Sequence, residues 1–193
     1  MKSEEVHSQA LVHFKDLAAS LGSIPTESVR ALADALSELR IEARSLFVVG
    51  NGGSAATASH IAADLGRNAR MDVRSITDAA ASLTALVNDV GLEAMFVGPL
   101  EAALREGDAL LAISVSGASP NVLAAMRYAK ACGNRVFALL GHDGGPARNI
   151  ADLAVVIPSS DYGVVEDTHL AINHYLVKAL GYDPSDPAQP TDR

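Results

Sequence analysis

The sequence predicts an α/β protein: a doubly wound, mostly parallel sheet of about five strands with helices on both faces, preceded by two helices. Short continuous apolar runs, typical of strands buried on both faces of a parallel sheet, recur along the chain. They alternate with helical segments, which implies right-handed crossover connections. The 193 residues are 49% hydrophobic but only 4% aromatic, without Trp, so Ala, Val, Leu and Ile must build the core. This length suits one compact domain.

Two helices are expected before the first strand. Apolar residues recur at helical spacing from Ser3 to Leu21, and Gly22 ends that segment. The second helix is expected to begin at Thr26 as its N-cap and to run to about Leu39. Residues 1–43 therefore form a helical segment that precedes the α/β part.

The α/β core is expected over residues 44–181, followed by a flexible tail at 182–193. The expected strands cover residues 45–49, 73–76, 109–114, 135–140 and 153–157. The expected helices cover residues 54–66, two pieces of 79–104 divided near 88–91, and then 119–132, 146–150 and 164–180. No internal repeat or interdomain linker is evident, so all 193 residues are assigned to one domain.

Charge and composition exclude several classes of protein. The net charge is −8 and the isoelectric point is about 5.1, and no Lys/Arg run suggests nucleic-acid binding. The N-terminus lacks the apolar core of a signal peptide, and no apolar run approaches the roughly 20 residues of a membrane span. The single cysteine, Cys132, is expected to be a small buried residue, and one cysteine alone favours a reducing cytoplasm.

Two strand-to-helix turns are the candidate ligand sites, because doubly wound sheets bind ligands beyond the carboxyl ends of their strands. The first turn, 50–54, reads Gly-Asn-Gly-Gly-Ser, and its glycines allow close approach to a helix N-terminus. The second, 114–121, holds three serines, a glycine and a proline at the expected helix start. Together they can hold a phosphate with backbone N–H groups and hydroxyls, without a basic side chain.

A nicotinamide dinucleotide is an alternative ligand for the first turn. Gly50, Gly52 and Ala55 fit the permissive dinucleotide pattern, with Asp72 and Asp78 about 20 residues further on. The long helical preface and the second serine-rich turn argue against this reading, because a dinucleotide site requires neither.

Acid and histidine residues on two helices are the candidate chemical groups. His60 and Asp64 are four residues apart on one helix face, a spacing that suits two metal ligands or a base and its partner. The last helix carries Glu166, His169 and His174. Glu166 and His174 lie two turns apart, about 12 Å, so they share a site only if Glu166 reaches in from a frayed first turn. The remaining histidines are expected on the surface or in a turn: His7, His13 and His142.

Taken in order, these motifs resemble the phosphoheptose isomerases, enzymes with the sugar isomerase (SIS) fold that convert sedoheptulose 7-phosphate to glycero-manno-heptose 7-phosphate. The resemblance runs from the N-terminal helices to about Leu180. It is carried by the two turns, by His60 with Asp64, by Asn88-Asp89, by the Gly-rich segment 141–145, and by His169 with His174.

The resemblance implies a sugar-phosphate substrate and a homotetramer with sites between subunits, in which residues 1–43 are the oligomerisation segment. The expectation of no nucleic-acid or membrane partner and of a cytoplasmic location comes from the charge, the apolar runs and the single cysteine. It implies that Asp64 and His174 are catalytic, in place of a Glu and a His of the family, and that Glu166 stands in place of a Gln. The residues expected to bind substrate are Asn51, Gly52, Gly53, Ser54, Asp89, Ser114, Val115, Ser116 and Ser119. The residues expected to bind one Zn²⁺ per site are His60, Asp64, Glu166 and His174.

Two departures from the family bear on the mechanism. Asp64 is one methylene shorter than Glu, and Glu166 adds a negative charge that favours a bound cation. The expected reaction is an aldose–ketose isomerisation through a cis-enediol, with Asp64 or His174 as the base. The alternatives are a non-catalytic SIS protein that binds a partner, such as a regulator of a replication initiator, and a sugar-phosphate sensor.

Overall fold

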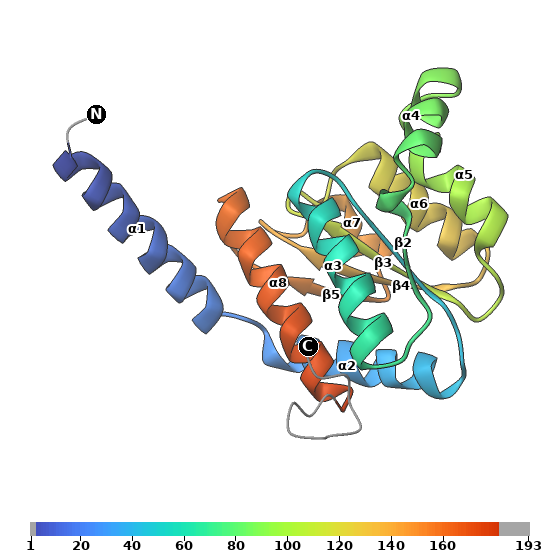
Figure 1. Cartoon of the computed structure of the whole chain (residues 1–193), viewed down its shortest axis with the longest axis horizontal. Coiled ribbons are helices and arrows are strands. Elements are labelled where there is room, and N and C mark those ends of the chain that lie inside the picture. The colour runs from blue at the N-terminus through green and yellow to red at the C-terminus, as the bar shows by residue number, and fades with distance from the viewer. Residues whose placement is uncertain (1–2, 182–193) are drawn as a thin grey trace.

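The computed structural model describes residues 3–181, which form a five-stranded parallel sheet with helices on both faces (Figure 1). The strands are β1 (Leu46–Gly50), β2 (Val73–Ser75), β3 (Ala109–Ser114), β4 (Arg135–Leu140) and β5 (Leu153–Val156). Their order is β2-β1-β3-β4-β5, and all four neighbouring pairs run parallel. The predicted doubly wound fold is confirmed.

The helices lie where the sequence pattern places them, within one or two residues at most boundaries. They are α1 (Ser3–Gly22), α2 (Thr26–Ile41), α3 (Gly53–Asn68), α4 (Ala80–Asp89), α5 (Ala94–Ala103), α6 (Pro120–Ala131), α7 (Gly145–Ile150) and α8 (Tyr162–Ala179). A 3₁₀ turn, Ile76–Asp78, links β2 to α4. The break predicted near 88–91 separates α4 from α5.

The core has two layers, one on each face of the sheet. Alternate residues of β1 point to opposite faces, so Leu46 and Val48 pack with α2, α3 and α8, whereas Phe47 and Val49 pack with α4, α5, α6 and α7. Strands β1 and β3 are buried at every position, which explains their unbroken apolar runs.

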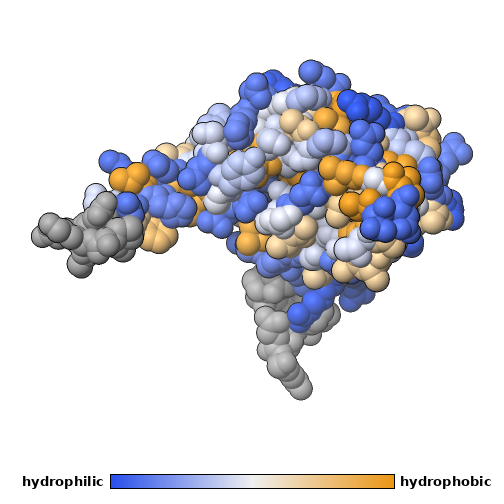
Figure 2. Space-filling model, turned by 90° about the horizontal axis from the view of Figure 1, so that it is seen from above, coloured by the Kyte–Doolittle hydropathy of each residue, from blue (hydrophilic) through white to orange (hydrophobic). Residues whose placement is uncertain are grey.

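Helix α1 projects from the body of the molecule (Figure 1) and contacts mainly α8. Its attachment includes a hydrogen bond of 2.9 Å between the hydroxyls of Ser20 and Thr168. Leu11, Val12 and Phe14 remain more than half exposed, and apolar side chains are visible along this helix in Figure 2. Within residues 3–181, no single helix is long and apolar enough to cross a membrane; α4 and α5 reach that composition only as a pair bent by 120°.

Three details differ from the sequence prediction. Thr26 is the first residue of α2 and not its N-cap, which is Pro25. Cys132 is exposed, because α6 ends at Ala131 and leaves the cysteine on the solvent side of the following turn. Helix α8 begins two residues early, at Tyr162, because the Asp161 side chain accepts the Val164 N–H and caps it. The flexible tail predicted for 182–193 lies outside the described residues.

Candidate active site

The two turns singled out in the sequence lie side by side at the carboxyl edge of the sheet. β1 and β3 are neighbours, with Gly50 opposite Ile113, so the turns that follow them meet. From β1 the chain moves outward to β2, whereas from β3 it moves to β4 on the other side. This is the switch point at which doubly wound sheets form their ligand crevice.

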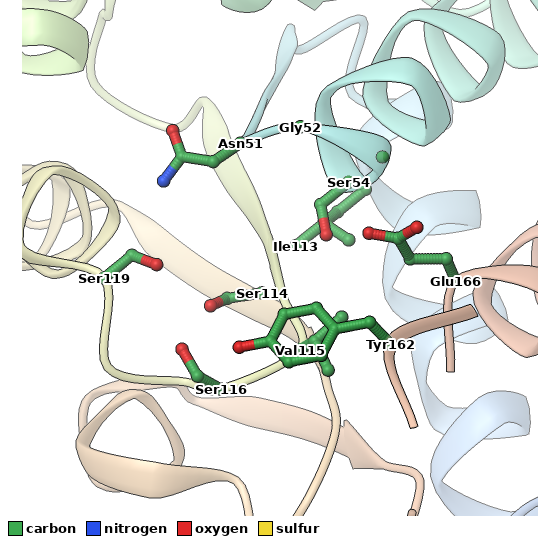
Figure 3. Close-up of a pocket in the computed structure, with 11 residues that line it drawn as sticks. Asn51, Gly52, Ser54, Ile113, Ser114, Val115, Ser116, Ser119, Tyr162 and Glu166 are labelled. Carbon is green, nitrogen blue, oxygen red and sulfur yellow. The ribbon is translucent and has the colours of Figure 1, made fainter. Parts of the chain in front are cut away.

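A pocket of about 330 Å³ opens between these turns (Figure 3). We call it the serine pocket. It is lined by Asn51, Gly52, Gly53, Ser54, Ile113, Ser114, Val115, Ser116, Ser119, Tyr162 and Glu166. Eight of the nine residues expected to bind substrate are among them. The ninth, Asp89, ends α4 in an exposed position, accepts a hydrogen bond of 2.7 Å from Asn88, and does not line the pocket in this chain.

The serine hydroxyls are arranged as donors. The Ser114 hydroxyl oxygen accepts the Gly117 N–H at 3.1 Å, and the Ser116 oxygen accepts the Ala118 N–H at 3.2 Å. Each hydroxyl hydrogen therefore stays available to an anion in the pocket. Ser119 makes no capping bond to its own helix, and Figure 3 shows its hydroxyl facing the cavity. The N-termini of α3 and α6 border the same space, and no Lys or Arg lines it.

Backbone geometry fixes the serine turn in place. Gly117 has a positive φ of 61°, and a side-chain carbon there would collide with the Gly144 carbonyl. The carbonyl of Gly117 accepts the Ala147 N–H at 2.9 Å. The Gly-rich segment 141–145, noted in the sequence as a turn, therefore supports the serine turn from the next strand.

An amide pair joins the two turns. Asn51 and Asn121 exchange side-chain hydrogen bonds of 2.9 and 2.8 Å, and Asn121 is 2% exposed. Asn121 ends the turn 114–121 singled out in the sequence, but it was not among the residues expected to bind substrate. Its place directly after Pro120, in the first turn of α6, is the signal that could have suggested it, because that turn borders the pocket.

Glu166 lies in the serine pocket, although the resemblance implied a metal site shared with His174. Because Asp161 caps α8, Glu166 lies in an ordered second turn and its carboxylate approaches Ser54 (Figure 3). A side-chain carbon at Gly53 would meet that carboxylate, so the Glu166 side chain would have to move to make room for it. Burial raises the pKa of the Glu166 carboxyl, the charge of Asp167 adds to the rise, and the Ser54 N–H opposes it. Tyr162, one turn earlier, also lines the pocket and was not predicted.

A second group of side chains, which we call the histidine cluster, lies between α3 and α8. One ligand atom each of His60, Asp64 and His174 falls within 4.8 Å of the others. The His60 Nε2 lies 3.2 Å from the Asp64 Oδ2, and the His60 and His174 rings are 5.4 Å apart. The cluster borders its own pocket of about 270 Å³, which shares no lining residue with the serine pocket. Two imidazoles and one carboxylate are a donor set that suits Zn²⁺ with an open position.

His169 belongs to neither group. It is fully buried, and its Nε2 lies 3.2 Å from the Leu140 carbonyl oxygen. Burial lowers the pKa of this imidazole to about 4, so it is neutral at neutral pH. Of the other histidines, His7 and His142 are exposed as expected, whereas His13, expected on the surface, is half-buried on α1.

Asp72 and Asp78, named for the dinucleotide alternative, do not line the serine pocket. Asp72 instead pairs with Arg74 at 2.7 Å and accepts the Ser45 hydroxyl at 2.7 Å. Asp72, which a dinucleotide site would direct toward the ribose, is thus engaged next to β2.

Fold and site together define a sugar-phosphate protein of the SIS class, and comparison with known proteins agrees: residues 13–141 match the SIS domain family. The phosphoheptose isomerase of Pelobacter propionicus is 42% identical over 150 residues, which cover 75% of this chain and 79% of that protein. That of Geotalea daltonii is 36% identical over 182 residues, covering 92% and 94%.

Solved structures show the same relationship. The phosphoheptose isomerase of Neisseria gonorrhoeae superposes with a TM-score of 0.85 at 27% identity, covering 91% of this chain and 98% of that one. The chain therefore belongs to the phosphoheptose isomerase family. This confirms the enzyme class predicted from the sequence, an aldose–ketose isomerase.

Proposed function

We propose that this protein converts sedoheptulose 7-phosphate to D-glycero-D-manno-heptose 7-phosphate through a cis-enediol. The observation that carries the proposal is the serine pocket: serine hydroxyls and two helix N-termini converge at the switch point of the sheet, and no basic side chain lines the space. Such a pocket suits the phosphate of a sugar and leaves the rest of the substrate outside it. Binding energy from the phosphate then aligns the reacting carbons.

The histidine cluster supplies the acid–base groups. In the proposed reaction Asp64 or His174 removes the proton from the carbon next to the carbonyl, and the proton is returned to the neighbouring carbon. The other residue moves protons between the two oxygens of the enediol. Their closeness supports this division of roles, since a base and a proton shuttle must reach adjacent atoms.

Zinc is the proposed cofactor, and His60, Asp64 and His174 would hold it. Their donor atoms, two nitrogens and one oxygen within 4.8 Å, match the three protein ligands of catalytic zinc sites. When bound, the ion would polarise the sugar carbonyl and stabilise negative charge on its oxygen. Glu166, the fourth ligand expected from the sequence, lies with Ser54 in the serine pocket and would face the substrate.

A homotetramer in the cytoplasm is part of the proposal, with residues 1–43 as the oligomerisation segment and residues 44–181 as the α/β core. The apolar residues of α1 support this role, because Leu11, Val12 and Phe14 are each more than half exposed. The separation of the two pockets also supports it, because the residues expected to act together do not all meet within one chain. In the proposed tetramer a neighbouring chain brings further residues, including Asp89, to the serine pocket.

The test is to incubate the purified protein with sedoheptulose 7-phosphate, with added zinc or with a chelator, and to follow the aldose by NMR. We expect the aldose to form with zinc and to decrease strongly with chelator. No product under any metal condition would contradict the proposal. It would then favour a partner-binding or sensing role, which binding of the sugar phosphate without turnover would identify.

A further inference from the structure

From the contacts of the histidine cluster we infer that Asn173 is a positioning residue that holds the Asp64 carboxylate in its metal-binding orientation. Asn173 precedes His174 on α8 and contacts a residue of α3 that lies 109 positions earlier in the chain. The inference rests on the proposed zinc site. It adds a residue that neither the turns nor the acid and histidine motifs of the sequence indicated.

The geometry is a direct hydrogen bond. The Asn173 Nδ2 donates to the Asp64 Oδ2 at 2.7 Å, and the same oxygen lies 3.2 Å from the His60 Nε2. Asn173 therefore holds the carboxylate from the α8 side while His60 lies on the α3 side. Since His174 is the next residue, one turn of α8 presents both a cluster member and the group that orients another.

The burial of Asn173 is not explained by packing. The side chain is fully buried, and its helix neighbours Ile172, Leu176 and Val177 belong to the apolar core. Its Oδ1 has no hydrogen-bond partner among the described residues. A buried amide with an unpaired oxygen costs free energy that an apolar side chain of similar size would not. The contact with Asp64 is the feature of this position that specifically requires an amide.

The chemistry of the contact suits a metal ligand. Asp64 is partly exposed, and without a fixed partner its carboxylate would sample several rotamers. A neutral amide fixes one rotamer and leaves the negative charge available to a cation, whereas a Lys or Arg partner would neutralise it. Groups that orient ligating carboxylates typically change metal affinity by about 10–100-fold.

The test uses the full chain, stripped with a chelator and titrated with Zn²⁺ in competition with a chromophoric chelator. We expect Asn173→Leu to weaken zinc binding by about 10–100-fold and to leave the melting temperature of the metal-free protein unchanged or higher. Thr168→Val is the matched control, since it removes a buried polar group from the same helix without touching Asp64. Zinc affinity of Asn173→Leu within twofold of the unmodified protein would overturn the inference.

A double-mutant cycle separates positioning from general damage to the site. If Asn173 acts through Asp64, Asn173→Leu causes no further loss of zinc affinity in an Asp64→Ala protein; additive losses would overturn the inference. Failure of the inference and failure of the proposed function are distinguishable. A protein that forms the aldose but binds no zinc overturns the role of Asn173, while its reaction stands.

Discussion

The serine pocket and the histidine cluster both take residues from helices α3 and α8 but are built in different ways. The pocket is built mainly from the two chain segments that follow β1 and β3, with Tyr162 and Glu166 added from α8, and its shape depends on backbone conformation and helix N-termini. The cluster consists of side chains from the middle of α3 and from α8, which approach only because the two helices pack together. A site that depends on the backbone of two turns can be predicted from short stretches of sequence. A site formed by the packing of two helices depends on the whole fold.

This difference implies that the two regions can be disabled separately. They share no lining residue in this chain, so substitutions in one are expected to leave ligand binding by the other intact. The following predictions test that separation, from the largest expected effect to the smallest.

Replacing His174 with Gln should abolish turnover and spare the serine pocket. The substitution removes an imidazole that belongs to the proposed acid–base pair, so we expect turnover of sedoheptulose 7-phosphate, measured by NMR, to fall by at least about 10²–10⁴-fold. Affinity for inorganic phosphate, measured by calorimetry, should stay within about twofold, because the separate pockets predict independent effects. The control is His7→Gln, an exposed histidine on α1 outside both regions. Full activity of His174→Gln would refute the assignment.

Replacing Gly117 with Ala should have the opposite pattern. The positive φ alone costs about 1–3 kcal/mol of stability for a residue with a side chain, and the collision with Gly144 displaces the serine turn. We expect phosphate affinity to fall by about 10-fold or more, as expected for lost charge-assisted hydrogen bonds, while zinc affinity is unchanged.

Gly133→Ala is the matched control for this substitution. Gly133 also has a positive φ, 78°, but a side-chain carbon there would meet nothing within 4 Å. It should therefore show the stability cost without the loss of phosphate binding. Equal phosphate affinities in the two variants would contradict a pocket held by the contact between Gly117 and Gly144.

The next prediction concerns the pH dependence of stability that results from His169, which lies on α8 between Glu166 and His174. Its pKa is about 4 in the folded protein and near 6.5 when exposed, so below pH 6.5 the unfolded chain binds a proton that the folded chain excludes. Stability should therefore fall as the pH falls from 6.5 toward 4. From pH 7 to pH 5 this residue accounts for a loss of about 2 kcal/mol.

The variant His169→Gln cannot titrate but can still donate to the Leu140 carbonyl. Urea unfolding at pH 7 and pH 5 should show a smaller pH-dependent loss than in the unmodified protein. His7→Gln, an exposed histidine on α1, should show the unmodified loss. The same pH dependence in both variants would mean that His169 is not the responsible group.

Replacing Glu166 with Gln should have the smallest effect, and it decides to which region this residue belongs. If Glu166 faces the phosphate, removing its negative charge should tighten phosphate binding a few-fold, consistent with about 1 kcal/mol between partly screened charges. Zinc affinity should not change. Asp167→Asn removes the same charge from an exposed neighbour and serves as control. A tenfold loss of zinc affinity in Glu166→Gln would instead place Glu166 with the histidine cluster.

Most of the fold followed from the sequence, because its signals are local. The strands predicted at 109–114 and 135–140 match the bounds of β3 and β4, because parallel strands buried on both faces consist of unbroken apolar segments. The exceptions are terminal: Thr26 and Cys132 were misplaced because the end of a helix depends on a single capping residue or on one last hydrogen bond.

The candidate site was only partly predictable. The serine pocket could be predicted because glycines, serines and Pro120 stand together in two short segments. Asn121 was missed because its role appears only when the two turns meet, and Tyr162 was missed because it lies on α8, far along the chain from both turns. Glu166 was grouped with His174 because the resemblance implied a shared metal site, although the distance of two turns along the helix spoke against it; the neighbour that each residue faces depends on how α8 packs.

By itself, the sequence determined the strands, the helices, the family and the two turns that form the serine pocket. These depend on periodicity, on backbone freedom at glycine and on residues close together in the chain. Only the tertiary structure decided that His60 and Asp64 meet His174, that Asn173 contacts Asp64, and that Glu166 turns toward Ser54. The physical reason is that packing of α3 against α8 sets these distances, and the packing angle of two helices results from all the core side chains between them.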